Sequence, residues 1–181
     1  MINIIWKGVY YNSLEYLKYY ADSKQNIIKS KIIGCLDAQF WYVDYIVQTN
    51  ENWEINSFEL SIDLNGEIST LTGKVEQGVW SINNVERKEF KNYKFIDISL
   101  SPFTNTLPIN HLKMGISDSY EIKVIYINIL EGKVEPRKQK YSRKRNRIYS
   151  YQNIPNTFSA DIKVDKFGFV INYPKLFKRI I

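Results

Sequence analysis

Three ionisable side chains of this sequence, Glu15, Asp97 and His111, are of the types that carry acid–base chemistry. If two of them met in one cavity, they could act as general acid and general base on a sugar or a lipid headgroup. His111 is the only histidine of the chain, so a metal site made of several histidines is excluded. A single histidine is also a poor signature for a catalytic triad or a zinc site. We therefore predict no catalytic residue, no metal site and no cofactor.

Each of these three residues also has a structural role that the sequence favours. Asp97 precedes a turn and could bond the backbone at Thr104–Thr106. His111 follows Asn110 on a predicted helix and could be a polar surface residue. Glu15 could be a carboxylate buried inside the sheet, where an unpaired charge is costly, and bond a sugar hydroxyl, or it could point to solvent. The sequence thus favours a binding protein, with an enzyme acting on a sugar or lipid headgroup as the alternative.

Aromatic residues are abundant, with 14 Tyr, 9 Phe and 4 Trp. Such side chains suit the pleated surfaces of β-sheets. Trp6, Trp53 and Trp80 could form stacking platforms for the face of a sugar, or line an apolar groove. Ordinary packing in the core also explains these residues, and it is the interpretation that we favour for any single one.

A basic run covers residues 137–147, with seven Lys and Arg and no acidic residue. The seven positive charges of this run exceed the net charge of +6, so the excess of basic residues is confined to this segment. The run could attract an anionic membrane surface through Arg143, Lys144 and Arg145, or grip a nucleic-acid backbone. It could also be a solvated hairpin tip. No nucleic-acid fold motif accompanies it, so the lipid interpretation is favoured over nucleic acid.

Short alternating segments separated by turn signals indicate about a dozen β-strands. Residues 85–90 and 93–100 are predicted to pair across Lys91-Asn92, and residues 142–147 to form the tip of another hairpin. Asn65-Gly66 is the strongest hairpin signal, and Gly34 could mark a bulge. Residues 14–20, predicted here as a strand, could instead start a helix. The predicted strands are residues 14–20, 27–36, 40–48, 57–64, 68–75, 78–82, 85–90, 93–100, 120–130, 134–141, 148–151, 158–164 and 169–173.

The segment 120–130 does not alternate, because both of its faces are apolar. Such a strand must be covered on both sides. A helix over residues 107–114, started at Pro108 and ended by Gly115, is the expected cover. We predict a mainly β protein in which residues 1–181 form a single domain. One large antiparallel sheet curls into a half-barrel or barrel, with one or two short helices, and can enclose a ligand cavity.

Three features of the composition point to the cytoplasm. No apolar run approaches the ~18 residues that a membrane span needs. The first residues show no basic region or cleavage site typical of a signal peptide. Cys35 is the only cysteine and cannot form an internal disulfide, which fits a reducing compartment.

The stretch from Ser101 to Ile109 reads S-P-F-T-N-T-L-P-I, and it resembles the pattern T-P-x-T-N-T-L-P-I of the putative glycolipid-binding family. Further matches follow the family along nearly the whole chain, at Trp6, Leu14-Glu15, Tyr45, Trp53, Gly78-x-Trp80, Asp97, Gln139-x-Tyr141, Tyr151, Asp165-x-x-Gly168 and Tyr173-Pro174. The chain departs from the family at Asn110-His111 and at residues 54–56, where the family usually has arginines. If those arginines bind an anionic headgroup in relatives, this member binds a different one.

The resemblance implies a half-barrel around a hydrophobic groove and the binding of a lipid or glycolipid without catalysis. The acyl part would lie in the groove, and polar residues at its mouth would hold the headgroup. The candidate ligand-binding residues are Trp6, Glu15, Trp53, Trp80, Asp97, Thr104, Asn105, Thr106, Gln139, Tyr141 and Tyr151.

Overall fold

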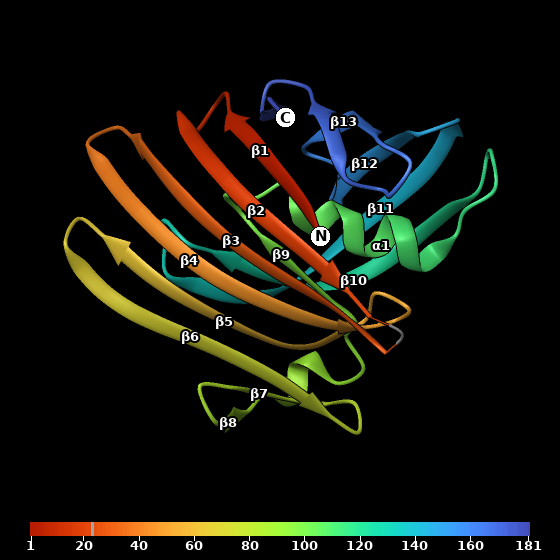
Figure 1. Ribbon diagram of the computed structural model, residues 1–181. Coiled ribbons are helices and arrows are strands. Elements are labelled where there is room, and N and C mark those ends of the chain that lie inside the picture. The colour runs from red at the N-terminus through yellow and green to blue at the C-terminus, as the bar shows by residue number, and fades with distance from the viewer. Residues whose placement is uncertain (23) are drawn as a thin grey trace.

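The computed structural model describes residues 1–22 and 24–181, and these form one curled sheet of 15 strands (Figure 1). The predicted mainly β fold, with one large sheet and little helix, is confirmed. The strands are β1 (Ile2–Gly8), β2 (Ser13–Ala21), β3 (Gln25–Leu36), β4 (Gln39–Asn50), β5 (Ile55–Leu64), β6 (Glu67–Glu76), β7 (Val79–Ile82), β8 (Val85–Glu86), β9 (Phe95–Ile98), β10 (Ser119–Asn128), β11 (Lys133–Arg145), β12 (Ile148–Ile154), β13 (Ser159–Val164), β14 (Val170–Tyr173) and β15 (Phe177–Arg179).

The two ends of the chain meet in the middle of the sheet, where β1 pairs with β15. From there, antiparallel neighbours run outward through β2 to β8 on one side and through β14 to β10 on the other. The sheet stays open, with β8 and β9 as its two edges. The strands β1 and β15 were not among those predicted. Each also pairs with its neighbour in the sequence, β1 with β2 and β15 with β14.

The curl of the sheet brings β9 and β10 across the concave side of β2, β3 and β4, as Figure 1 shows. The stacked rings of Tyr45 and Phe103, with centroids 6.4 Å apart, join the two layers. In β10, Val124 and Ile125 lie on opposite faces and are both buried. The prediction that this strand is covered on both faces is therefore confirmed. The helical segment packs against the two strands that flank β10, since His111 contacts Phe95 of β9 and Asn105 contacts Tyr141 of β11.

The predicted hairpin of residues 85–90 and 93–100 is wrong. Only Val85–Glu86 forms a strand there, and a 3₁₀ helix, η1 (Lys88–Phe90), follows. The chain then crosses to the other edge of the sheet, where β9 pairs parallel with β10. Phe95 on one face of β9 and Ile96 and Ile98 on the other are all buried. A hairpin on the outer edge beside β7 would leave one of these faces in water, so burial favours the distant partner.

The helical segment begins earlier than predicted. A 3₁₀ helix, η2 (Phe103–Asn105), leads into α1 (Thr106–Leu112). Pro108 lies in the first turn, where a helix tolerates a residue without an N–H donor. The helix ends at Lys113, whose φ of 45° is left-handed, so Gly115 is not the helix stop. No helix in the described part of the chain is long and apolar enough to cross a membrane.

Two side chains of α1 attach the helix to one end of the barrel. Asn110 donates a hydrogen bond to the carbonyl of Phe167 over 2.9 Å, and His111 Nδ1 lies 2.8 Å from the carbonyl of Asn52. The first of these contacts reaches the β13–β14 turn and the second reaches the β4–β5 loop. The helix α1 therefore lies across this end of the half-barrel.

Two smaller predictions also need correction. The expected hairpin tip of residues 142–147 is mostly strand, because β11 continues to Arg145 and the turn is confined to Asn146 and Arg147. Gly34 is not in a bulge, since it pairs in regular register with Ser13 and Trp41. A Cβ at this glycine would lie 2.6 Å from the Trp41 ring, so the position needs a residue without a side chain.

Candidate functional site

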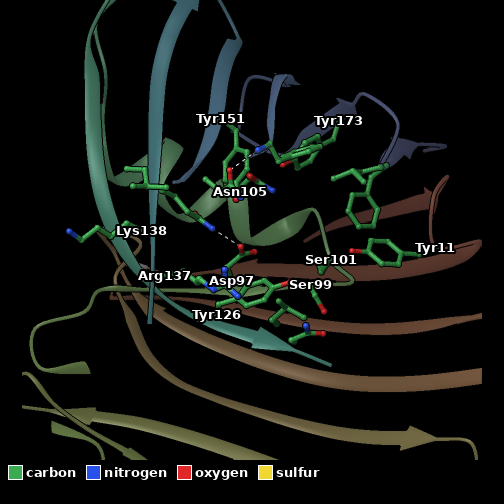
Figure 2. A pocket seen from close by; sticks show the side chains of 18 of the residues that line it. Tyr11, Asp97, Ser99, Ser101, Asn105, Tyr126, Arg137, Lys138, Tyr151 and Tyr173 are labelled. Atoms are coloured by element: carbon green, nitrogen blue, oxygen red, sulfur yellow. Dashed lines mark hydrogen bonds between the residues drawn. The ribbon is translucent and has the colours of Figure 1, made fainter. Parts of the chain in front are cut away.

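A cavity of about 420 Å³ opens between β9–β11 on one side and β12–β15 on the other. Its size lies in the range of roughly 300–1,000 Å³ that is usual for small-molecule sites. Residues of η2 and of the loop after β9 close its inner end, and Tyr11 from the β1–β2 loop lies across from them (Figure 2). The lining residues are Tyr11, Asp97, Ile98, Ser99, Ser101, Asn105, Tyr126, Asn128, Glu131, Arg137, Lys138, Gln139, Tyr151, Asn153, Ile154, Phe158, Tyr173, Leu176 and Phe177.

One wall of this cavity is polar and is centred on Asp97. The Asp97 carboxylate accepts a hydrogen bond from the Thr104 hydroxyl over 2.9 Å and another from the Gln139 amide over 2.6 Å. Pro102 follows the end of β9, and the chain turns there into η2, which brings Thr104 back to the strand. The expected bond to the backbone of this turn is made instead to a side chain. Burial raises the pKa of Asp97, and these two hydrogen bonds oppose the rise.

The opposite wall is aromatic and comes from neighbouring strands. The ring centroids of Tyr151 and Tyr173 lie 6.0 Å apart, and those of Tyr173 and Phe177 lie 6.2 Å apart. Phe177 continues the row to Tyr11, at 5.8 Å. Burial raises the pKa of the hydroxyls of Tyr11, Tyr151 and Tyr173, and the nearby Asp97 carboxylate adds to the rise. These hydroxyls are therefore neutral donors that face a carboxylate across the cavity.

Charged residues at the mouth of the cavity are paired with each other. Arg137 Nε donates to Glu135 over 2.8 Å, and its guanidinium lies 5.3 Å from the centre of the Tyr126 ring. Glu131 accepts from Lys133 Nζ over 2.7 Å. The edge of the cavity thus carries both signs of charge, and Lys138, which also lines it, takes part in neither of these pairs.

Two candidate residues, Thr104 and Tyr141, lie directly behind the polar wall. The Tyr141 hydroxyl donates to Asn105 Oδ1 over 2.8 Å, and Asn105 Nδ2 donates to the carbonyl of Pro102 over 3.1 Å. These bonds fix the side chain of Asn105, which lines the cavity. Thr106 is fully buried beneath them, away from the lining.

Glu15 lies one side chain behind the cavity. It is buried, and its Oε1 accepts hydrogen bonds from Ser30 at 2.8 Å, Tyr45 at 2.6 Å and Ser101 at 2.9 Å. Burial raises its pKa to about 7, against the lowering effect of these bonds. Its other oxygen has no hydrogen-bond partner among the described residues. Glu15 does not point to solvent. Of its three hydrogen-bond partners, only Ser101 lines the cavity.

The three candidate tryptophans lie outside this lining. The indole of Trp6 donates to the carbonyl of Val170 over 2.7 Å, and the indole of Trp80 donates to the carbonyl of Tyr93 over 2.9 Å. Both are fully buried in the core. Trp53 stacks on Tyr19, with centroids 5.6 Å apart. Packing is therefore sufficient to explain each of them.

The structure does not bring the three acid–base candidates together. Asp97 lines the cavity, while Glu15 is separated from it by Ser101, and His111 lies on α1 with its ring edge-on to Phe95. His111 Nε2 is 3.9 Å from Glu54 Oε1, so the histidine connects the helix to the β4–β5 loop. This arrangement offers no acid–base pair on a shared substrate.

The basic run is only partly free. Arg143 donates to the carbonyl of Met114 over 2.6 Å, and its guanidinium lies 5.9 Å from the centre of the Tyr149 ring. Lys144 is paired with Asp161 at 2.7 Å, and Arg145 is exposed. The strand register shifts between Arg143 and Arg145, and Asn146 and Arg147 form a turn. The predicted anionic-surface site is thus divided, with Arg143 used inside the protein.

Four of the predicted residues line the cavity directly, namely Asp97, Asn105, Gln139 and Tyr151. Sequence reasoning missed most of the aromatic wall. Tyr173 appeared only as a match to the family pattern, and Tyr11 lies in a loop with no signal of its own. Arg137 belongs to the basic run, and its position on the face of β11 shared with Gln139 places it at the edge of the cavity.

A second hollow of about 340 Å³ lies between β5–β6 and the β10–β11 turn. Its walls are mainly apolar, with Leu64 and Leu71 on one side and Ile127 and Ile129 on the other. Asn128 belongs to the lining of both this groove and the polar cavity. The two hollows lie on opposite faces of β10, since Tyr126 lines the cavity and Ile127 lines the groove, and both reach Asn128 at the end of the strand.

Comparisons with known proteins agree with this architecture. A family model described as "Putative glycolipid-binding" matches residues 3–179. The crystal structure of a DUF1089-family protein from Pseudomonas aeruginosa is 25% identical and superposes with a TM-score of 0.82, and the match covers 92% of each chain. A comparison with curated proteins gave no match.

Proposed function

The chain belongs to the putative glycolipid-binding family, and on that basis we propose that it binds the sugar headgroup of a glycolipid in the cavity beside Asp97. The observation that carries this proposal is the contrast between the two walls. The aromatic row of Tyr151, Tyr173 and Phe177 lines the same cavity as the polar group of Asp97 and Gln139. A single small cavity thus offers a stacking surface and fixed hydrogen-bonding groups.

A sugar ring matches this contrast. Its face presents C–H groups that pack on an aromatic ring, and its edge presents hydroxyls that both donate and accept. The Asp97 carboxylate accepts only, while the tyrosine hydroxyls and the amides of Gln139 and Asn105 can donate. The hydrogen bonds among these protein groups hold them in place before a ligand arrives, which lowers the entropic cost of binding.

The apolar groove is the proposed place for the hydrocarbon chain. It shares Asn128, at the end of β10, with the polar cavity, and it is lined by aliphatic side chains such as Leu64 and Ile129. An amphiphile that crosses this point would keep its headgroup among polar groups and its chain among apolar ones. Burial of each methylene would add about 0.8 kcal/mol at most.

Two measurements test the proposal. Native mass spectrometry of protein purified from cells is expected to show a co-purified lipid. Calorimetric titration should show that octyl glucoside binds more tightly than methyl glucoside, by about tenfold or more. Tyr151→Ala should weaken both ligands, while Tyr42→Ala, which removes an exposed ring on the outer face, should weaken neither.

A matched pair of variants tests the groove by itself. Ile68→Asp places a charge in the groove and should remove the advantage of the octyl chain. Ile116→Asp changes another exposed isoleucine, outside the groove, and should leave the advantage of the octyl chain intact. If methyl glucoside and octyl glucoside both fail to bind and no lipid co-purifies, the proposed function is wrong.

A further inference from the structure

The Asp97 carboxylate is partnered only by neutral groups in the structure. Its two hydrogen-bond donors are the Thr104 hydroxyl and the Gln139 amide. Among the described residues it takes part in no ion pair. An ionised carboxylate withdrawn from water without a cation is costly, so this site has an unmet requirement for positive charge.

The two cations that line the cavity do not meet that requirement. Arg137 is bound to Glu135 and packs over the ring of Tyr126. Lys138 extends away from Asp97 in Figure 2. Neither Arg137, which is paired with Glu135, nor Lys138, which points away, neutralises Asp97. The cavity therefore contains a carboxylate without a cationic partner.

The surrounding rings also suit a cation. Tyr11, Tyr126, Tyr151 and Tyr173 all line the cavity, and the Asp97 charge influences the pKa of each of their hydroxyls. The face of an aromatic ring attracts an ammonium group within about 6 Å, most strongly where water is excluded. A carboxylate among several rings is thus a better match for an amine than for a neutral hydroxyl.

We propose that the headgroup bound in this cavity carries a protonated amine, which pairs with the Asp97 carboxylate. This inference rests on the proposed function and adds a chemical class to it. The amine can belong to an amino sugar or to a simple amine headgroup, because both offer the same ammonium group. A neutral sugar would leave the Asp97 charge without a counterion.

Two pairs of probes separate these sources. The first pair is methyl glucoside and methyl 2-amino-2-deoxyglucoside, which differ in one amine. The second pair is octyl glucoside and octylamine, which share a chain length. Calorimetry at pH 7.5 should show the amino glycoside binding about tenfold more tightly than methyl glucoside, since hydrogen bonds to charged groups are the strong ones. If octylamine binds more tightly than octyl glucoside, the amine alone is sufficient for binding. If octyl glucoside binds more tightly, the amine must be part of an amino sugar.

The variant that decides the inference is Asp97→Asn, which keeps the shape and removes the charge. It should bring the affinity ratio of the two methyl glycosides close to one. Asp44→Asn, on the outer face beside Lys31, should leave the ratio unchanged. If Asp97→Asn does not fold, the ratio in the unmodified protein decides by itself.

Equal affinity of the unmodified protein for both methyl glycosides would overturn the amine while leaving sugar binding in place. A ratio that persists in Asp97→Asn would overturn the role of Asp97. If none of the four probes binds, the proposed function is wrong, and so is the proposal that the headgroup carries an amine.

Discussion

Gln139 reaches over β10 to donate a hydrogen bond to Asp97, 2.6 Å away. The two residues lie on β11 and β9, which flank β10 and share no backbone pairing. Asp97 stands beside Tyr126 in the ladder, and Gln139 stands beside Ile122. This contact therefore joins the edge strand of the sheet to the rest of the polar wall, and it makes the carboxylate part of a fixed surface.

Gln139→Leu should weaken ligand binding about tenfold, because it removes a donor that stabilises the Asp97 carboxylate. Loss of this hydrogen bond should raise the pKa of Asp97 further. Calorimetry with the amino glycoside measures the effect. Gln152→Leu, on the neighbouring strand and outside the cavity lining, serves as the control. Unchanged affinity in Gln139→Leu would show that the polar wall does not contact the ligand.

Glu15 should make the protein less stable as the pH rises from about 4.5 to about 7. Burial raises the pKa of Glu15 to about 7 from its ordinary value of 4.5. The folded state therefore holds the Glu15 proton in a range where the unfolded chain has released it. Stability falls with pH wherever the folded state binds more protons, here by a total on the order of 3 kcal/mol.

Glu15→Gln should remove this part of the pH dependence. Urea unfolding at pH 5 and pH 8 gives the change in the free energy of unfolding for each protein. The change should be smaller in Glu15→Gln than in the unmodified protein, while the exposed Glu59→Gln should behave like the unmodified protein. The same pH dependence in Glu15→Gln and the unmodified protein would contradict the assignment.

Gly168→Ala should destabilise the end of the half-barrel where α1 contacts the β13–β14 turn. Gly168 has a φ of +83°, and a Cβ there would lie 2.2 Å from Asn110 Oδ1, within the contact that holds α1. Gly66→Ala is a matched control, because its φ is +86° and nothing lies within 4 Å of its Cβ position. Both variants pay the cost of a left-handed backbone, roughly 1 kcal/mol. Thermal unfolding should show a larger loss for Gly168→Ala, and equal losses would mean that Asn110 can move aside freely.

His111→Ala should lower stability by about 1 kcal/mol, because it removes the contact to the Asn52 carbonyl and the packing on Phe95. Ligand affinity should not change, since His111 does not line the cavity. Denaturant unfolding and calorimetry on the same sample measure both effects. A loss of affinity in a stably folded His111→Ala would revive an acid–base role for this histidine.

Much of the local structure was encoded in short stretches of sequence. The alternation of residues 57–64 correctly predicted a strand, and Asn65-Gly66 correctly predicted the hairpin that follows it. The stretch from Ser101 to Ile109 indicated both the end of a strand and the start of a helix. Side-chain period and turn chemistry act over a few residues, so a sequence can reveal them directly.

Pairings between distant segments were decided by the tertiary structure. Nothing near Phe95 indicates that β9 pairs parallel with β10, and nothing near Tyr11 places it opposite Asp97. These choices depend on how far the sheet curls and on which strand can cover both faces of another. The sequence therefore determined most of the strands and which of their faces are apolar. Only the fold determined which of those faces meet, because burial is a property of the whole sheet.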